Sequence, residues 1–241
     1  GYSGQTIQRI EEATQATRPM VVEKLCALYG VDTEEMSHLT SLAVGGKEQG
    51  WYEPFFDLGT GRVSRPRIPL FQETEQVAWR ILVHEINIVP GLLQTQAYLR
   101  ELQAIQIGML EESAEAWRAL RTKRQSLLYS RRPLPEMQFL LGRPVIDFLE
   151  GMPAEVRDEQ IGRMLEVAAM PQVSIRVLTR MYPGALSSFN VLFPEDEADA
   201  FAFADADEGC RYIPEPQLVS MYGQLFSAAQ EMSVPLEEYL Q

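Results

Sequence analysis

The sequence predicts a fold that is mainly α with a smaller mixed α+β part, and three observations support this class. Apolar residues recur at helical spacing through the first 46 residues. Glycines and prolines then interrupt residues 50–69, where no regular element continues. Beyond them, helical patterns alternate with short stretches of period two, which is the pattern of half-buried strands. Helices followed by a mixed helix-and-strand region predict two domains, which we place at residues 1–46 and 70–241 with a linker at 47–69.

The N-terminal segment carries signals for three short helices. Residues 3–12 (SGQTIQRIEE) are predicted to form the first, with Ser3 as its N-cap. Residues 20–29 form the second, which Gly30 ends. Asp32 precedes the third, where its carboxylate can cap the first turn. The second helix is expected to turn one apolar stripe inward, formed by Val21, Val22, Leu25, Leu28 and Tyr29.

The C-terminal domain is predicted to alternate helices and strands. A helical pattern begins at residue 70 and gives way to a strand within residues 81–88, where β-branched residues accumulate. A Pro-Gly turn follows, and then a helix begins at about Thr95. The remaining predicted elements are, in order, a helix at 111–129, a strand at 137–141, helices at 144–149 and 153–170, strands at 173–178, 187–194 and 199–205, and a helix at 216–230.

The charge of the chain is uneven. A net charge of -13 argues against a protein that coats nucleic acid by bulk electrostatics. The acidic residues concentrate in residues 195–215, and we interpret the acidic run at 195–208 as a solvated loop. Residues 118–132 carry six basic residues and no acid. We interpret the basic stretch as a helix face directed to solvent. Its residues Arg121, Lys123 and Arg124 are then available to the acidic stretch of the same or another subunit.

The sequence shows no sign of a membrane or secretory protein. No apolar run approaches the roughly 20 residues that a membrane-spanning helix needs. The polar N-terminus does not resemble a signal peptide either. Two cysteines, Cys26 in a helix and Cys210 in the acidic loop, do not make a disulfide framework. We therefore expect a cytoplasmic protein without a membrane partner.

The sequence contains few residues of the types that catalysis or metal binding requires. With two histidines and two isolated cysteines, no zinc-ligand spacing exists. The acidic run lacks an EF-hand pattern, and no glycine loop stands between a strand and a helix as a phosphate site requires. We predict no catalytic residues, no metal and no cofactor. An enzymatic role is disfavoured but left open.

A ligand site is predicted where large apolar side chains gather beside chain breakers. Trp51 and Phe55 of the linker are expected to meet Trp79, and His84 and Tyr98 supply polar groups that can orient a small molecule. Two interpretations stay open here. The aromatic side chains form either a pocket or a packed core between the linker and the domain.

Several sequence blocks resemble a family of bacterial regulators. GYSGQTIQRIEE and RPMVVEKLCALYGVD are similar to the second half of a helix-turn-helix of the XRE type. VPGLLQTQAYLREL, LEVAAMPQVSIRVL and SSFNVLFP resemble blocks of the long domain that follows it. Over nearly its whole length the chain thus resembles actinobacterial XRE-family regulators of the WhiJ type. The resemblance implies a partial helix-turn-helix bundle followed by an α/β C-terminal domain that senses a ligand or a partner protein.

The resemblance also implies a DNA-reading role for the first helix. Gln5 and Gln8 occupy the exposed positions that face base edges, where glutamine pairs bidentately with adenine. Two residues depart from the family pattern. Glu12 stands where a basic or polar residue is usual, and Ala13 replaces the glycine that ends the helix. A carboxylate near phosphates weakens binding. The residues assigned to DNA binding are Ser3, Gln5, Thr6, Gln8 and Arg9.

The sequence leaves more than one function open. The first is a homodimeric, DNA-binding transcriptional regulator whose C-terminal domain senses a small-molecule effector or a small partner protein. The second is a diverged relative that has lost DNA binding and acts as a small-molecule-binding protein or enzyme in specialised metabolism. The acidic total, Glu12 and Ala13 favour the second hypothesis more than they would for an ordinary regulator. A pure protein-interaction module is the third. Because no catalytic constellation is present, the regulator ranks first.

Overall fold

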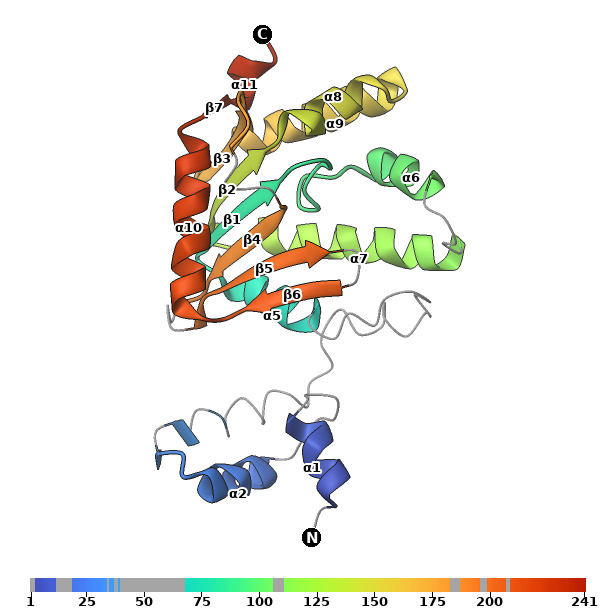
Figure 1. Cartoon of the computed structure of the whole chain (residues 1–241). Coiled ribbons are helices and arrows are strands. Elements are labelled where there is room, and N and C mark those ends of the chain that lie inside the picture. Colours follow the sequence, from blue (N-terminus) through green and yellow to red (C-terminus); the bar gives the residue numbers. More distant parts are fainter. Residues whose placement is uncertain are drawn as a thin grey trace. The chain divides into compact units, whose positions relative to one another are not determined.

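A computed structural model describes residues 3–11, 19–33, 35–36, 39, 68–105, 111–182, 187–195, 199–206 and 209–241. The chain divides into two compact units, Gly1–Glu53 and Pro54–Gln241 (Figure 1). Among the helices of the described ranges, none combines the length and the apolar character that crossing a membrane requires.

The N-terminal unit begins with α1 (Gly4–Glu11), and its predicted cap is confirmed. The amide of Thr6 donates to Ser3 Oγ at 3.2 Å, which satisfies one of the free donors of the first turn. Ile7 and Ile10 are half-buried on one side of the helix. Gln5 and Gln8, which we assigned to base contacts, are exposed.

The second helix, α2 (Pro19–Tyr29), ends at Gly30, whose φ of +74° lies in the left-handed region that glycine adopts without strain. Its packing corrects the predicted stripe. Val21 and Cys26 are buried, but Leu28 is 75% exposed, because it lies in the last turn, beyond the part of α2 that packs. The predicted cap of the next helix is confirmed, since Asp32 Oδ1 accepts the amide of Glu35 at 2.9 Å.

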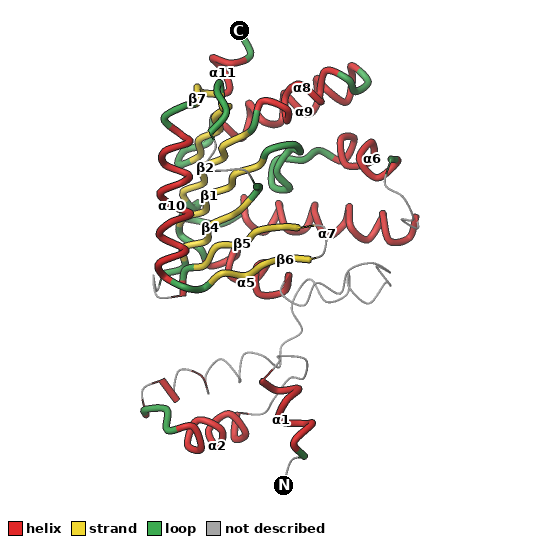
Figure 2. Tube along the Cα trace, in the orientation of Figure 1, coloured by secondary structure: helices red, strands yellow, loops and turns green. Residues whose placement is uncertain are grey.

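In the described part of the C-terminal unit, seven strands form one mixed sheet in the order β6-β5-β4-β1-β2-β3-β7 (Figure 2). The central strands β1, β2 and β3 are parallel to one another. Antiparallel strands complete the sheet on both sides. The strands are β1 (Arg80–Glu85), β2 (Glu136–Leu141), β3 (Val173–Leu178), β4 (Phe189–Phe193), β5 (Phe201–Ala206), β6 (Gly209–Ile213) and β7 (Ser233–Pro235).

Helices cover both faces of this sheet and make a three-layer unit (Figure 1). One long helix, α10 (Pro216–Gln230), packs across one face. The opposite face carries α5 (Ile68–Val77), α6 (Gln96–Ala104), α7 (Glu111–Tyr129), α8 (Arg143–Glu150) and α9 (Ala154–Ala168). A short helix, α11 (Leu236–Tyr239), follows β7. The predicted fold class is confirmed.

The alternation of side chains along the strands creates two cores. In β1, Ile81 and Val83 join the cluster under α5 to α9, whereas Leu82 joins the cluster under α10. The same alternation directs His84 toward α10 and Glu85 toward the many-helix face. The side chains of neighbouring residues in one strand therefore lie on opposite faces of the sheet, and only polar side chains on the same face can contact each other.

Three elements were not predicted. The first is β6, so Cys210, which we placed in the acidic loop, lies in a strand. This strand is stabilised by backbone pairing with β5, from Ala202↔Ile213 to Ala206↔Gly209, and the local sequence does not predict such pairing. The strand β7 has three residues and ends in Pro235, too few for a period to show. The short helix α11 follows it directly.

Candidate functional site

A tightly held loop runs from the end of β1 to α6, and we call residues 89–95 (VPGLLQT) the PGLLQT loop. Tyr98 explains the spacing of this block, because its hydroxyl accepts the amide of Val89 at 3.0 Å. Gln94 Nε2 donates to the carbonyl of the same residue at 2.8 Å. Thr95 then caps α6 by accepting the amide of Tyr98 at 3.2 Å. The loop is thus closed by its own side chains.

Three side chains from neighbouring helices hold the backbone of the loop. Gln160 of α9, which is fully buried, accepts the amide of Thr95 and donates to the carbonyl of Leu93, both at 2.8 Å. Gln125 and Tyr129 of α7 donate to three further carbonyls at 2.8–2.9 Å, those of Gly91, Leu92 and Gln94. Because its buried backbone groups are paired in this way, the loop is fixed against both helices.

Gly91 lets the PGLLQT loop pass directly over two guanidinium groups. A Cβ built at this position would lie 2.6 Å from Cζ of Arg121 and 3.2 Å from Nη1 of Arg124. Any larger residue would have to push the Arg121 side chain aside. The glycine therefore brings two arginines of α7 against the same backbone position.

A buried ion pair anchors one of these arginines, and it corrects the predicted basic face. Arg124 donates from Nε and Nη2 to the two carboxylate oxygens of Glu75 in α5, at 2.5 Å each. Its guanidinium also lies 5.2 Å from the ring centroid of Phe71. Arg124 is buried and Arg121 is half-buried, so only Lys123 of the predicted solvent-facing trio is exposed. The prediction of a solvent-exposed Arg124 is wrong, because the carboxylate of Glu75 in α5 compensates its charge and allows the side chain to be buried.

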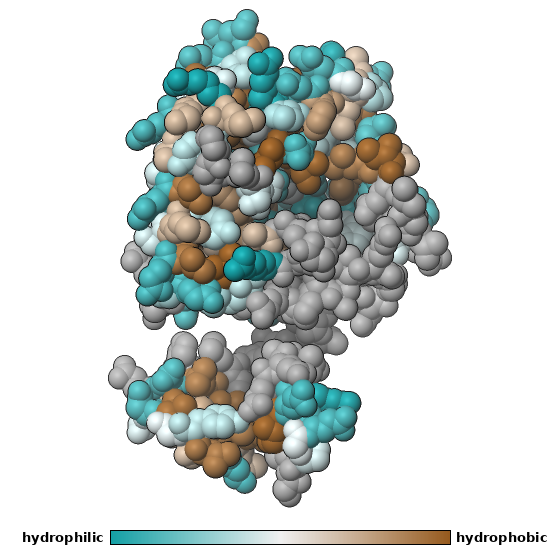
Figure 3. Space-filling model, in the orientation of Figure 1, coloured by the Kyte–Doolittle hydropathy of each residue, from teal (hydrophilic) through white to brown (hydrophobic). Residues whose placement is uncertain are grey.

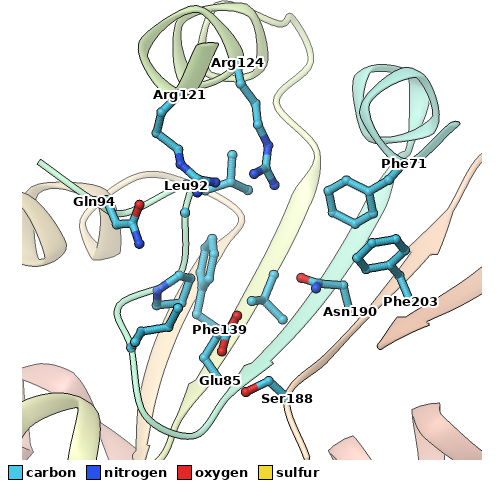
Figure 4. Close-up of a pocket in the computed structure, with 14 residues that line it drawn as sticks. Phe71, Glu85, Leu92, Gln94, Arg121, Arg124, Phe139, Ser188, Asn190 and Phe203 are labelled. Carbon is cyan, nitrogen blue, oxygen red and sulfur yellow. The ribbon is translucent and has the colours of Figure 1, made fainter. Parts of the chain in front are cut away.

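A pocket of about 140 Å³ lies beneath the PGLLQT loop (Figure 4). It sits at the carboxyl ends of β1 and β2 and at the start of β4, the edge where ligands of open α/β sheets usually bind. Arg121 and Arg124 enter it from α7, and Glu85 and Ser188 approach from the strands (Figure 4). The rings of Phe71, Phe139 and Phe203 also line it.

Gln94, one of the residues that line the pocket, has a buried side-chain acceptor that the described residues do not satisfy. Gln94 is 4% exposed, and its Oε1 has no hydrogen-bond partner in the described part of the chain. Its Nε2 donates to Val89, which fixes the orientation of the amide. An unpaired buried acceptor costs about 1–3 kcal/mol, and this oxygen is enclosed by the protein.

Of the residues that we predicted to bind a ligand, the three that the structure describes, Trp79, His84 and Tyr98, are not brought together. Trp51 and Phe55 lie outside the described residues. Trp79 is 41% exposed and contacts the ring of Phe193, with centroids 6.3 Å apart. His84 faces α10 and Tyr98 holds the PGLLQT loop on the opposite face of the sheet. The alternation along β1 turns His84 to the face of the sheet that Tyr98 does not contact.

His84 is a buried, packed histidine. Its ring stacks on Phe189 with centroids 5.0 Å apart, and Nδ1 lies 3.1 Å from the carbonyl oxygen of Ser187. Burial lowers the pKa of His84, and the hydrogen bond to Ser187 opposes that shift in part. Nε2 has no partner among the described residues. His84 thus stays neutral at pH 7 and supports the layer under α10.

The residues assigned to DNA binding lie on or beside α1. Gln5, Gln8 and Arg9 are exposed, as a base- or phosphate-contacting set must be. Ser3 and Thr6 bond each other, with 2.9 Å between Oγ and Oγ1, and so shape the start of the helix.

Sequence analysis did not single out the pocket residues Gln94, Arg121 and Arg124 as ligand contacts. One signal was available: the PGLLQT block itself places a polar Gln94 directly after two leucines and three residues from Gly91. Within the ranges that the structure describes, no three histidine, cysteine or acidic residues gather as metal ligands would.

The N-terminal unit is thus helical and has a helix with an exposed polar face, and the C-terminal unit is an α/β domain with a pocket of about 140 Å³. Residues 1–39 match the model of a helix-turn-helix domain, which gives the chain the architecture of a helix-turn-helix regulator. Residues 68–240 match the family described as Domain of unknown function (DUF5753), and the chain belongs to this family. No curated protein and no solved structure matches the chain significantly.

Proposed function

We propose that this protein is a DNA-binding transcriptional regulator of the XRE type whose DUF5753 domain binds a small effector beneath the PGLLQT loop. One observation carries the proposal: a unit that matches a helix-turn-helix domain shares a chain with an α/β unit that holds a partly buried polar pocket. The sequence blocks that resemble actinobacterial regulators of the WhiJ type support it further.

The exposed face of α1 supplies the chemistry for reading DNA. Gln5 and Gln8 can each pair with adenine, and Arg9 can neutralise a phosphate. Because the chain carries a net charge of -13, this local face has to supply the attraction that the whole molecule does not. Helix-turn-helix regulators bind two half-sites as dimers, and we infer a homodimer here.

The pocket favours a small molecule over a protein segment as the effector. Its volume of about 140 Å³ is below the range of about 300–1,000 Å³ that holds drug-sized ligands. An effector changes DNA affinity only if it binds the DNA-bound and free states with different affinities. The ligand is therefore expected to shift the DNA affinity of the dimer.

Selection from a pool of random duplexes, followed by anisotropy titrations at several salt concentrations, tests DNA binding. Arg9→Ala should weaken binding to all duplexes and lower the salt slope by about 1. Gln5→Ala should cost about 1–3 kcal/mol of discrimination at one base pair. Lys123→Ala removes the same charge as Arg9→Ala from the exposed face of α7 and should change neither property. If no duplex is enriched and binding ignores salt, the DNA-binding function is refuted.

A further inference from the structure

We propose that the pocket beneath the PGLLQT loop binds an uncharged, ring-sized molecule that presents a carboxamide or lactam edge to Asn190. Such an edge carries a hydrogen-bond donor and an acceptor side by side, and the side-chain amide of Asn190 carries the complementary pair. The inference rests on the proposed function, because it names the chemical class of the effector that the DUF5753 domain binds.

Asn190 is a polar residue on an apolar face of the sheet. It is the second residue of β4, where it pairs with Val83 of β1 and with Phe203 of β5. Both neighbours belong to the core cluster under α5 to α9, and both line the pocket. Directly opposed residues of a sheet turn their side chains to the same face, so the amide of Asn190 enters this apolar layer. Packing alone does not explain a polar side chain at this position.

The amide of Asn190 is available to a ligand. The residue is half-buried, and within the part of the chain that the structure describes its side chain forms no hydrogen bond. Figure 4 shows the amide pointing toward the middle of the pocket, which Arg124 enters from α7. The oxygen and the NH2 group of an asparagine lie side by side, so they complement a ligand edge whichever way the amide is turned.

The charges around the pocket favour an uncharged ligand. The guanidinium of Arg124 is compensated by the carboxylate of Glu75, which it meets in the buried ion pair. Arg121 and Glu85 line the pocket with opposite charges, and both already interact with other groups of the protein. The lining and Glu75 together carry two positive and two negative formal charges. A charged ligand would thus lose its hydration on entering without meeting a net opposite charge.

Aromatic rings set the shape of the ligand's apolar body. Phe71 and Phe203 pack with ring centroids 4.7 Å apart, and Phe139 of β2 lines the same pocket. Apolar side chains of this kind gain from burying a hydrocarbon ring. The volume of about 140 Å³ restricts the ligand to a single ring with a short polar substituent.

The Asn190 amide distinguishes a carboxamide from close analogues. A ketone offers an acceptor but no donor, so the oxygen of the asparagine amide stays unpaired in a site that the ligand closes to water. A carboxylate offers only acceptors and leaves the same oxygen unpaired. Leaving such a group unpaired lowers the affinity by about 5- to 150-fold. Only an edge with both a donor and an acceptor pairs with the whole amide.

The test uses the full chain and three probes of nearly the same shape. Benzamide presents a donor and an acceptor, acetophenone replaces the amino group by a methyl group, and benzoate presents a charged carboxylate. Isothermal titration calorimetry should show benzamide binding at least about fivefold more tightly than either of the other two. If acetophenone or benzoate binds as tightly as benzamide, or if no probe binds, the carboxamide class is refuted.

Replacing Asn190 by leucine locates the contact. Asn190→Leu keeps the approximate size of the side chain and removes the amide, so benzamide and acetophenone should bind this variant equally. Asn87→Leu makes the same substitution at the other asparagine of the chain, which is exposed, and should keep the preference for benzamide. A preference that survives in Asn190→Leu would show that another residue reads the carboxamide.

The stability of the same variant separates ligand contact from structural support. Because the amide of Asn190 has no partner among the described residues and its cross-strand neighbours are apolar, Asn190→Leu should raise the urea midpoint of unfolding or leave it unchanged. A polar group that is retained for function commonly costs stability in this way. A lower midpoint would show that the amide supports the fold, and it would overturn the assignment of Asn190 to the ligand.

The outcomes also distinguish this inference from the proposed function. If the carboxamide class is refuted, the DNA titrations, which use no ligand, still decide whether the protein binds DNA. If benzamide binds with the expected preference but does not change DNA affinity, the carboxamide class stands and the effector role in the proposed function is refuted.

Discussion

Replacing Arg124 by methionine should destabilise the C-terminal unit by about 3–5 kcal/mol, because it leaves a buried carboxylate without its partner. Glu75 is 0% exposed, and Arg124 supplies it with two hydrogen bonds of 2.5 Å. Small proteins have unfolding free energies of about 5–15 kcal/mol, so the loss is a large share of the total. The unit should still fold at low temperature, with a lower unfolding midpoint in urea.

Removing both charges should reverse most of that loss. In the double variant Glu75→Leu with Arg124→Met, apolar side chains of similar size replace the pair, and stability should return to within about 1 kcal/mol of the parent or exceed it. Both variants and the parent are compared by equilibrium urea unfolding, followed by tryptophan fluorescence and circular dichroism, with the midpoints read at constant slope. Adding the single variant Glu75→Leu completes a double-mutant cycle, in which the loss of the double variant minus the sum of the two single losses gives the coupling energy of the pair.

The neighbouring residue provides the control. Lys123→Met removes the same charge one position earlier on α7, where the side chain is exposed, and should change stability by no more than about 0.5 kcal/mol. If Arg124→Met costs no more than Lys123→Met, the pair is not buried. If the double variant is as unstable as Arg124→Met alone, the unpaired carboxylate is not the cause of the loss.

Two further predictions concern buried polar groups. Gln160→Leu leaves the amide of Thr95 and the carbonyl of Leu93 unpaired, so it should lower the free energy of unfolding in urea by about 2–4 kcal/mol. A loss no larger than that of the exposed control Gln224→Leu would show that Gln160 does not hold the PGLLQT loop. Because the pKa of His84 is lower in the folded than in the unfolded chain, its contribution to stability is complete above about pH 6.5 and falls as the pH drops below that value. Unfolding between pH 7.5 and 5.5 should therefore show a smaller loss of stability with acidity in His84→Phe than in the parent, and identical pH profiles would contradict it.

Local patterns were enough to predict most of the regular elements. The period of two in residues 173–178 matches β3, and Thr95 caps α6 as its position suggests. Gly30 ends α2 in the left-handed conformation. These features depend on residues within a few positions of one another, because caps, turns and amphipathic faces are set by neighbouring residues.

Contacts between distant residues decided the site. Glu75 and Arg124 are 49 residues apart, and Gln160 and Leu93 are 67 apart. An arginine on an amphipathic helix has the same local pattern whether it meets solvent or a buried carboxylate. The sequence therefore predicted the helix of Arg124 correctly, but it wrongly predicted that the side chain is exposed to solvent.

The amino-acid sequence alone determined the class of the fold, the position of the PGLLQT block and the exposed polar face of α1. The tertiary structure decided which polar groups meet. The alternation along β1 sends His84 and Glu85 to opposite faces, and parallel pairing brings the ends of β1 and β2 to one edge. A pocket forms there because the PGLLQT loop, two helices and the edge of the sheet meet at this place. Their meeting depends on contacts between residues that are far apart in the chain, and no local hydrophobic period encodes such contacts.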